Sequence, residues 1–181
     1  MKNIIIIGAP RCGKTTLSNL LYEKIKCQII HGDCERTAID LVFPELNIKN
    51  NENFIKYLEI LLRKQQRDNK YQYPVILEST DITPDNIDKY FNRDNNIIIC
   101  LGIVSIDYKE FAKKIIDNDT KLDWTYKYTL EQIEKYTKEY INISLKYQQE
   151  CLKRNIKFID TSHNRQEILN KLCIDIINII N

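Results

Sequence analysis

The chain has 181 residues, of which 27 are basic and 25 acidic, so its formal net charge is +2. This length fits one α/β domain with a single core, and we expect residues 1–181 to form one domain. The balanced charge gives no electrostatic argument for nucleic acid or an anionic membrane as the main partner. No run approaches the roughly 20 apolar residues that span a bilayer. We therefore expect a cytoplasmic monomer or homodimer with no nucleic-acid and no membrane partner.

Six cysteines fall at irregular spacings, with no Cys-x-x-Cys pair. This pattern predicts neither a zinc site nor a disulfide framework, and it is typical of reduced core cysteines. Cys12 stands apart because it lies in a glycine-rich segment. It is either a thiol with a lowered pKa or an ordinary loop residue.

The segment Gly-Ala-Pro-Arg-Cys-Gly-Lys-Thr, residues 8–15, matches the phosphate-binding pattern Gly-x-x-x-x-Gly-Lys-[Ser/Thr] at every fixed position. An apolar, β-branched run at 3–7 precedes it and predicts a strand, and residues 16–26 predict a helix. The backbone N–H groups of such a loop and the start of the helix make an anion site. The pattern predicts nucleotide binding by Gly8, Ala9, Arg11, Cys12, Gly13, Lys14, Thr15 and Thr16.

Two members of this segment have predicted roles of their own. Lys14 is expected to reach the β- and γ-phosphates of the nucleotide, and the Thr15 hydroxyl is expected to ligate Mg²⁺. Arg11 is an unexpected residue, a cation in the middle of the loop that faces either the phosphates or the solvent.

The remaining chain alternates between predicted strands and helices. Strands are expected at 27–31, 73–77, 97–104 and 156–159, and helices at 35–43, 53–67, from Pro84, from about 108 to 117, at 130–152 and after Asn164. This alternation predicts a parallel sheet with right-handed crossovers. Ligands of such sheets bind beyond the carboxyl ends of the strands, so the polar residues just after each strand matter most.

Several helix ends have recognisable sequence signals. Thr83 followed by Pro84 predicts an N-cap and a first helical position, and Ser105 or Asp107 is expected to cap the next helix. Asn164 with Glu167 could form a capping box. The long helix at 130–152 is amphipathic, and its predicted stripe consists of Leu130, Ile133, Tyr140, Ile141, Leu145 and Leu152, with Ser144 among them. The tyrosine-rich stretch at 126–147 is either a subunit interface or core.

A first candidate site follows the second strand, in the sequence His-Gly-Asp-Cys-Glu-Arg at 31–36. Asp33 either accepts a proton from, or orients, the hydroxyl of an acceptor molecule, or it merely caps a helix that starts at Cys34. Arg36 could hold an anionic group. His31 is expected to be a structural residue at the strand end.

A second candidate site follows the third strand, which is apolar and ends in Glu78. A carboxylate at this position holds Mg²⁺ in many nucleotide-binding sheets. Glu78 is therefore expected to bind the metal or the acceptor, with Asp81 as the alternative.

A third candidate is the polar segment between the fourth strand and the long helix, at about 118–128. Phosphoryl transfer needs cations near the developing charge and a flap that excludes water. The stretch 113–127 offers four cations, Lys113, Lys114, Lys121 and Lys127, of which Lys121 and Lys127 lie in the expected lid. Trp124 could pack on a base or under the flap. The alternative is a solvated loop anchored by the tryptophan. A fourth segment, 160–165, either borders the base or caps the last helix.

Taken in order, these features resemble the P-loop small-molecule and nucleotide kinases, a group that includes adenylate, shikimate and gluconate kinases and chloramphenicol phosphotransferase. The loop around Gly8-Ala9-Pro10 and Gly13-Lys14-Thr15 is similar to that of adenylate kinases. Asp33 resembles the acceptor-hydroxyl residue of the shikimate and chloramphenicol enzymes. The resemblance implies a three-layer P-loop fold, a five-stranded parallel sheet of order 2-3-1-4-5 and a small lid.

The resemblance also implies a function. The chain is expected to move the γ-phosphoryl group of ATP, with Mg²⁺, to a small acceptor such as a nucleotide, nucleoside or hydroxyl metabolite. Lys14 and Asp33 would be catalytic, Thr15 and Glu78 would hold the metal, and Asp33, Arg36 and Glu78 would bind the acceptor. The chain departs from adenylate kinases because its lid contains no arginine and because Arg11 stands where many such loops have glycine.

Two other classes of nucleotide-binding protein fit less well. A GTPase needs Asn-Lys-x-Asp, whereas Asn170-Lys171 is followed by Leu172-Cys173. A motor of the AAA+ type needs a longer chain. The alternative that stays open is a non-catalytic P-loop protein that acts as a nucleotide-dependent switch or sensor.

Overall fold

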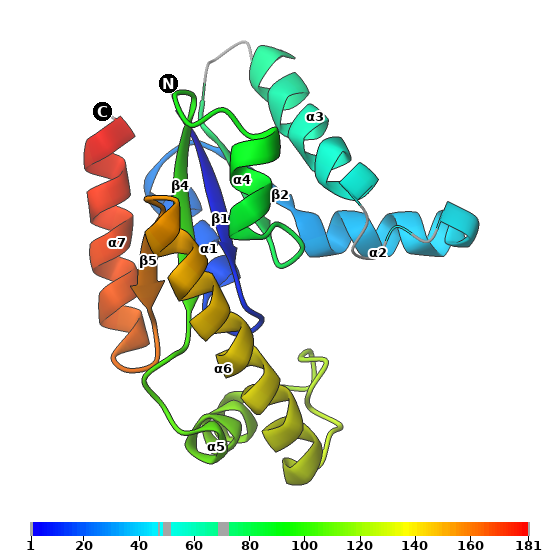
Figure 1. Ribbon diagram of the computed structural model, residues 1–181, viewed down its shortest axis with the longest axis vertical. Coiled ribbons are helices and arrows are strands. Elements are labelled where there is room, and N and C mark those ends of the chain that lie inside the picture. Colours follow the sequence, from blue (N-terminus) through cyan, green and yellow to red (C-terminus); the bar gives the residue numbers. More distant parts are fainter. Residues whose placement is uncertain (1, 47, 49–51, 69–72, 181) are drawn as a thin grey trace.

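The computed structural model describes residues 2–46, 48, 52–68 and 73–180. In this part of the chain five parallel strands form one sheet of order β2-β3-β1-β4-β5, which confirms the predicted order (Figure 1). The strands are β1 (Asn3–Gly8), β2 (Gln28–His31), β3 (Val75–Ser79), β4 (Asn96–Gly102) and β5 (Lys157–Asp160).

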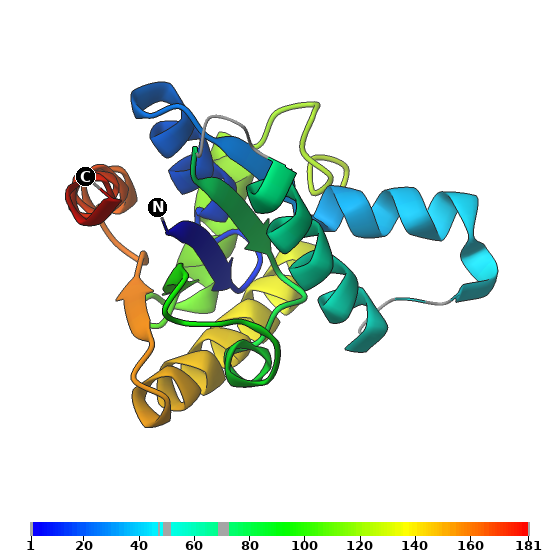
Figure 2. The same cartoon turned by 90° about the horizontal axis from the view of Figure 1, so that it is seen from above.

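Helices cover both faces of the sheet (Figure 2). The helices are α1 (Lys14–Lys24), α2 (Gly32–Val42), α3 (Glu52–Asp68), α4 (Pro84–Tyr90), α5 (Tyr108–Asn118), α6 (Leu130–Lys153) and α7 (Arg165–Ile180), with a 3₁₀ turn at Pro44–Leu46. Helices α1, α5 and α7 pack on one face, α3 and α4 on the other, and α6 contributes to both cores. The expected α/β class and three-layer architecture are confirmed.

The central strand β1 is fully buried. Its side chains alternate between the two faces, so that Ile4 and Ile6 join the core under α1 and α7, and Ile5 and Ile7 join the core under α3 and α4. Each buried isoleucine contributes about 1.5–3 kcal/mol to folding. A continuous apolar run is what a strand covered on both faces requires.

Helix α2 begins three residues earlier than the sequence predicted, and this corrects one alternative for Asp33. The helix starts at Gly32 with His31 as its N-cap, so Asp33 lies inside the first turn and does not cap a helix at Cys34. The early start depends on glycine, because a Cβ on Gly32 would lie 2.6 Å from the Oγ of Ser79. Glycine thus lets the chain turn directly against the end of β3.

Two of the predicted caps are confirmed. The side chain of Asn86 accepts a hydrogen bond from the Thr83 backbone N–H at 2.9 Å, and Pro84 occupies the first position of α4. Asp107 caps α5, because its Oδ1 accepts from the backbone N–H of Lys109 at 2.9 Å. Asn164 instead has a left-handed φ of 47°, which differs from the extended backbone of a capping-box residue.

The buried face of α6 agrees with the predicted stripe at Ile133, Tyr140 and Ser144 and differs from it at the leucines. Leu130, Leu145 and Leu152 are exposed, and the buried residues are Ile133, Thr137, Tyr140, Ser144, Tyr147 and Cys151. Small hydroxyl side chains lie under this helix because it crosses the sheet closely. The hydroxyls of Thr137 and Ser144 donate to helix or loop carbonyls, so their burial leaves no polar group unpaired.

Helix α2 projects away from the sheet (Figure 1), and Gly32 is its one buried residue. Its first turn nevertheless lies against β3 and carries Asp33, and Arg36 follows at the start of the next turn. Among the described residues, no helix is long and apolar enough to cross a membrane.

The contact between Gly32 and Ser79 gives a test of the fold. Gly32→Ala is expected to lower the free energy of unfolding by about 1–3 kcal/mol, because the added Cβ overlaps Ser79 and must push α2 from β3. Urea denaturation followed by circular dichroism measures this change. Cys34→Ala, at an exposed position of the same helical turn, is the control and should change stability by less than about 0.5 kcal/mol. Equal midpoints for the two variants would contradict the close approach.

Candidate functional site

A cavity of about 1080 Å³ lies over the carboxyl ends of β1, β2 and β3. It is lined by Gly8, Ala9, Pro10, Arg11, Gly13, Lys14, Thr15, Thr16, Asp33, Arg36, Glu78, Thr80, Asp81, Asp123, Trp124, Tyr136, Glu139, Tyr140, Ile143, Tyr147 and Arg165. The fold therefore brings the glycine loop and the polar residues after the second and third strands into one space.

The glycine loop has the geometry of an anion site. Gly13 has a φ of 99°, a conformation that favours glycine, and it sits at the N-terminus of α1. Lys14 is buried, and its Nζ donates hydrogen bonds to the backbone oxygens of Gly8 at 3.2 Å and Ala9 at 3.0 Å. These bonds hold the ammonium group over the loop, where it would meet a phosphate.

Thr15 and Glu78 lie together, as the sequence reasoning expected of a metal pair. The Thr15 hydroxyl donates to the two carboxylate oxygens of Glu78 at 3.1 and 3.3 Å. Nδ1 of His31 lies 2.7 Å from Oε1 of the same carboxylate. The Glu78 side chain is 8% exposed, so these two neighbours are its main compensation for burial.

The donor set of this pair fits Mg²⁺. The metal prefers oxygen ligands and keeps several waters, so a hydroxyl and one carboxylate beside a phosphate site suit it. Within the described ranges, no group of three or more His, Cys, Asp or Glu side chains is placed to hold a metal ion. A metal here would be shared between Thr15, Glu78 and a bound phosphate.

Asp33 is fixed by the segment that follows β3. Its Oδ1 accepts from the Thr80 hydroxyl at 2.7 Å and from the Thr80 backbone N–H at 3.3 Å. These two bonds orient the carboxylate and use only one of its oxygens. The second oxygen, Oδ2, is outside these bonds, and Asp33 lines the cavity.

Arg36 lies one turn further along α2 and pairs with Asp81. Its Nη1 donates to Oδ1 of Asp81 at 3.2 Å, and the Asp81 side chain is 3% exposed. Burial raises the pKa of Asp81, and the nearby Asp33 carboxylate adds to the rise, while the Arg36 guanidinium opposes it. Oδ2 of Asp81 is buried and has no hydrogen-bond partner in the described part of the chain.

The Arg11 guanidinium binds the segment 118–128, which the sequence analysis expected to act as a lid and which is called the lid below. Its Nη2 donates to Oδ1 of Asp119 at 2.6 Å and to the Thr125 hydroxyl, and its Nη1 donates to Oδ1 of Asp123 at 2.9 Å. Arg11 has a left-handed φ of 62°, which costs a residue with a Cβ about 1–2 kcal/mol. Its ion pairs with two lid carboxylates offset this cost.

Three predicted site residues do not line the cavity: Lys121, Lys127 and Cys12. The two lysines are exposed on the lid. The Cys12 side chain is fully buried, and burial raises its pKa, so the possibility of a lowered thiol pKa was wrong. Cys12 takes part in the loop through its backbone, since its carbonyl oxygen accepts from the Thr161 hydroxyl at 2.8 Å.

The sequence analysis assigned no cavity role to the residues of α6, and it considered Arg165 only within the segment 160–165, which it expected either to border the base or to cap the last helix. Tyr136, Tyr140, Ile143 and Tyr147 are spaced by four, three and four residues, so they share one helical stripe. This stripe is the signal that could have identified them, once α6 was known to lie beside the glycine loop. Arg165, at the start of α7, lies so close to the loop that a Cβ on Gly13 would be 3.5 Å from its Cδ.

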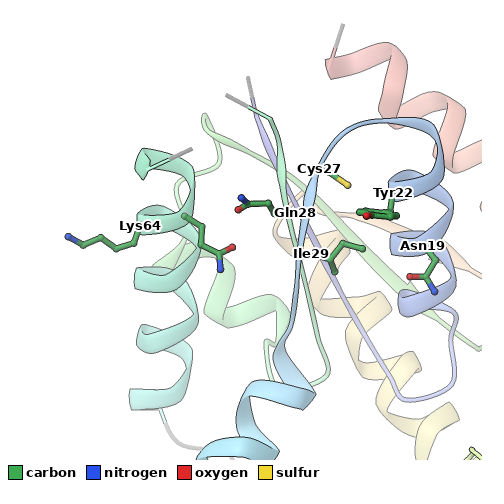
Figure 3. A pocket seen from close by; sticks show the side chains of 7 residues that line it. Asn19, Tyr22, Cys27, Gln28, Ile29 and Lys64 are labelled. Atoms are coloured by element: carbon green, nitrogen blue, oxygen red, sulfur yellow. The ribbon is translucent and has the colours of Figure 1, made fainter. Parts of the chain in front are cut away.

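A second concavity, of about 750 Å³, lies along the outer edge of the sheet at the start of β2. Figure 3 shows Asn19 and Tyr22 projecting from α1 on one side of the strand, and Lys64 projecting from α3 on the other. Burial raises the pKa of Cys27 in this concavity to about 11, so its thiol is not activated. The cavity over the glycine loop is therefore the candidate site.

The contact between Arg11 and the lid gives a test by spectroscopy. Arg11→Asn keeps a residue that tolerates left-handed backbone and removes the cation, which leaves Asp119, only 6% exposed, without its ion pair. We expect the lid to detach and the free energy of unfolding to fall by about 1–3 kcal/mol. Trp124 is the single tryptophan and packs edge-on against Tyr128 and Tyr136, so its emission should shift to the red.

The Trp124 emission should also depend on pH in the wild-type protein. Hydrogen bonds from Thr120, and then the charge of Arg11, lower the pKa of Asp123. The stability that Asp123 contributes is fully present above its unfolded pKa of about 3.9, and it is lost as the pH falls through its lower folded pKa. Arg63→Asn, which removes a surface ion pair on α3, is the control. An unchanged Trp124 spectrum in Arg11→Asn would contradict the contact.

Comparison with known proteins identifies the fold. No family model matches the chain, and no curated protein sequence matches it significantly. Solved structures do match. Shikimate kinase from Acinetobacter baumannii in complex with shikimate aligns over 99% of this chain and 93% of its own, with 17% identity and a TM-score of 0.54.

Two further structures superpose slightly better. Shikimate kinase from Bacteroides thetaiotaomicron aligns over 99% of this chain and 97% of its own, with 13% identity and a TM-score of 0.58. A sugar kinase from a Janibacter species aligns over 96% and 93%, with 12% identity and a TM-score of 0.58. The glycine loop, the sheet order and these superpositions agree, and the chain has the fold of the P-loop kinases.

Proposed function

We propose that this protein transfers the γ-phosphoryl group of ATP, with Mg²⁺, to a hydroxyl group of a small molecule. The observation that carries the proposal is that the glycine loop, the Thr15–Glu78 pair and the Asp33 carboxylate line one cavity. The structures it resembles are named as kinases of shikimate and of sugars, which are small hydroxyl-bearing molecules.

Each residue has a distinct part in this reaction. The loop amides and the Lys14 ammonium bind the β- and γ-phosphates and stabilise the charge of the moving phosphoryl group. Thr15 and Glu78 hold Mg²⁺, which would neutralise phosphate charge. Asp33 accepts the proton of the acceptor hydroxyl. The acceptor oxygen then bonds to the γ-phosphorus while the bond to the β,γ-bridging oxygen breaks, and ADP leaves.

The role of Asp33 depends on its contacts with Thr80. Because Oδ1 is occupied by the Thr80 hydroxyl and N–H, the carboxylate keeps one orientation and presents the other oxygen to a ligand. Because Thr80 already fixes the Asp33 carboxylate, this group loses no further rotational freedom when the reaction occurs.

One observation favours the non-catalytic alternative. The lid offers no basic side chain to the cavity, and its carboxylates bind Arg11 instead. A nucleotide that competes for Arg11 would move the lid without any phosphoryl transfer. Production of ADP that depends on an added acceptor separates the two functions, because a switch protein would bind ATP without it.

A first prediction concerns Asp33. Asp33→Asn preserves the shape and the bond from Thr80 but removes the proton acceptor, so the turnover number should fall by about 10²–10⁴-fold. ATP binding, measured by calorimetry, should be unchanged. Asp40→Asn, in the same helix but outside the cavity, is the control. An undiminished transfer rate in Asp33→Asn would rule out the proposed role.

A second prediction concerns Glu78. Glu78→Gln should raise the Mg²⁺ concentration that gives half-maximal transfer by about 10-fold or more, because one anionic oxygen ligand is lost. A titration of initial rate against Mg²⁺ at constant ATP measures this. Glu59→Gln on α3, outside the cavity, is the control. The same Mg²⁺ dependence in both variants would remove Glu78 from the metal site.

A third prediction concerns Lys14. Lys14→Ala should weaken ATP binding and lower transfer by at least about 10²-fold, because no other ammonium group lies over the loop in the described part of the chain. Calorimetry with ATP and a transfer assay measure the two effects. Lys24→Ala, at the other end of α1, is the control. Unaltered ATP affinity in Lys14→Ala would count against both transfer and switching.

A further inference from the structure

The part of the cavity next to α2 and β3 is short of free cations. The basic side chain that α2 contributes to the cavity lining is Arg36, which already pairs with Asp81. The other cavity cations contact the glycine loop or the segment 118–128: Lys14 lies over the loop carbonyls, Arg11 binds Asp119 and Asp123, and Arg165 lies beside Gly13. An anionic group of an acceptor bound against α2 would therefore compete with Asp81 for Arg36.

Carboxylates, in contrast, are plentiful on the same walls. The Asp33 carboxylate lies close enough to Asp81 to contribute to the raised pKa of Asp81. Glu139 on α6 adds a third carboxylate to the lining. Where α2 meets the end of β3, the two carboxylates Asp33 and Asp81 face the single guanidinium of Arg36, and this balance of charge favours hydrogen-bond donors over anions.

Asp81 carries the decisive detail. Its Oδ1 is satisfied by Arg36 at 3.2 Å, whereas Oδ2 is buried without a partner among the described residues, in a side chain that is 97% buried. A buried carboxylate oxygen without a partner costs free energy. A hydroxyl or ammonium group of a ligand would remove this cost.

The wall that α6 contributes to the cavity is aromatic. Tyr136, Tyr140 and Tyr147 follow one stripe of α6, with Ile143 between them and Trp124 beside Tyr136. Burial and the Asp81 carboxylate raise the pKa of Tyr147, so its phenol stays protonated. Aromatic faces pack well on the C–H face of a sugar-like ring and also attract ammonium groups.

We infer that the acceptor is a non-anionic polyol, uncharged or amine-bearing, which gives one hydroxyl to Asp33 for phosphorylation and a second donor to Oδ2 of Asp81. This inference rests on the proposed function, and it makes Asp81 a specificity-determining residue. The similar shikimate kinase from Acinetobacter baumannii was solved in complex with shikimate, which is a carboxylate, so the acceptor class inferred for this chain differs from that ligand.

The test uses acceptors matched in shape and different in charge. Glucose, glucosamine and gluconate form one set, and adenosine with AMP forms a second. ADP production is followed with saturating ATP and Mg²⁺. Within at least one set, the neutral or amine-bearing member should have a kcat/KM at least 10-fold above that of its anionic partner. A ratio of about 10 is the size of effect expected from one hydrogen bond to a charged group. A preference for gluconate and AMP would overturn the inference.

A variant tests Asp81 itself. Asp81→Asn should raise the KM of the preferred acceptor by about 10- to 100-fold, with the KM of ATP unchanged and kcat retained within a few-fold. Amine-bearing acceptors should lose more than uncharged ones, because the charge of Asp81 is lost. Asp85→Asn, at an exposed carboxylate of α4, is the control. If Asp81→Asn changes only the unfolding midpoint, Asp81 is structural and the inference fails.

Binding measurements separate this inference from the proposed function. The same five acceptors are titrated by calorimetry into the protein saturated with a non-hydrolysable ATP analogue and Mg²⁺. Tighter binding of the non-anionic members, weakened in Asp81→Asn, supports the inference even if no transfer occurs, and the absent transfer then counts against the proposed function. The inference is overturned if the anionic members bind more tightly or if none of the five binds. The proposed function would survive that result if the protein slowly hydrolysed ATP, because phosphoryl transfer to water would then be observed.

Discussion

The burial of β1 on both faces is the constraint on which the rest of the structure depends. Ile4 to Ile7 have no exposed surface, so the strand carries no polar side chain between its ends. The chain can present polar groups only where it leaves the sheet, and it leaves through a loop whose N–H groups start α1. Because β2 and β3 run parallel to β1, their polar ends arrive at the same edge.

That edge concentrates three carboxylates, and each is compensated in its own way. Glu78 has Thr15 and His31, Asp33 has Thr80, and Asp81 has Arg36. Close carboxylates of this kind cost free energy unless each is paired. Glycine at position 32 makes the arrangement possible, since it allows α2 to begin against β3 and so places Asp33 within reach of Thr80.

The lid reverses the charge pattern that the resemblance to adenylate kinases suggested. In those enzymes the lid carries arginines, whereas here the arginine is in the glycine loop and the lid supplies Asp119 and Asp123. The cation that joins these two segments therefore belongs to the glycine loop, and the lid adds carboxylates rather than guanidinium groups to the edge of the cavity.

The sequence by itself determined the glycine loop, the α/β alternation and the acids after the second and third strands, because these are local patterns in consecutive residues. It also supplied the correct strand order through its resemblance to known kinases. Tertiary structure decided the start of α2, the partner of Arg11, the α6 stripe beside the loop and the unpaired oxygen of Asp81. Each of these depends on groups brought together from distant segments, such as Arg11 and Asp119, and no local pattern reports how far apart such groups lie once the chain has packed.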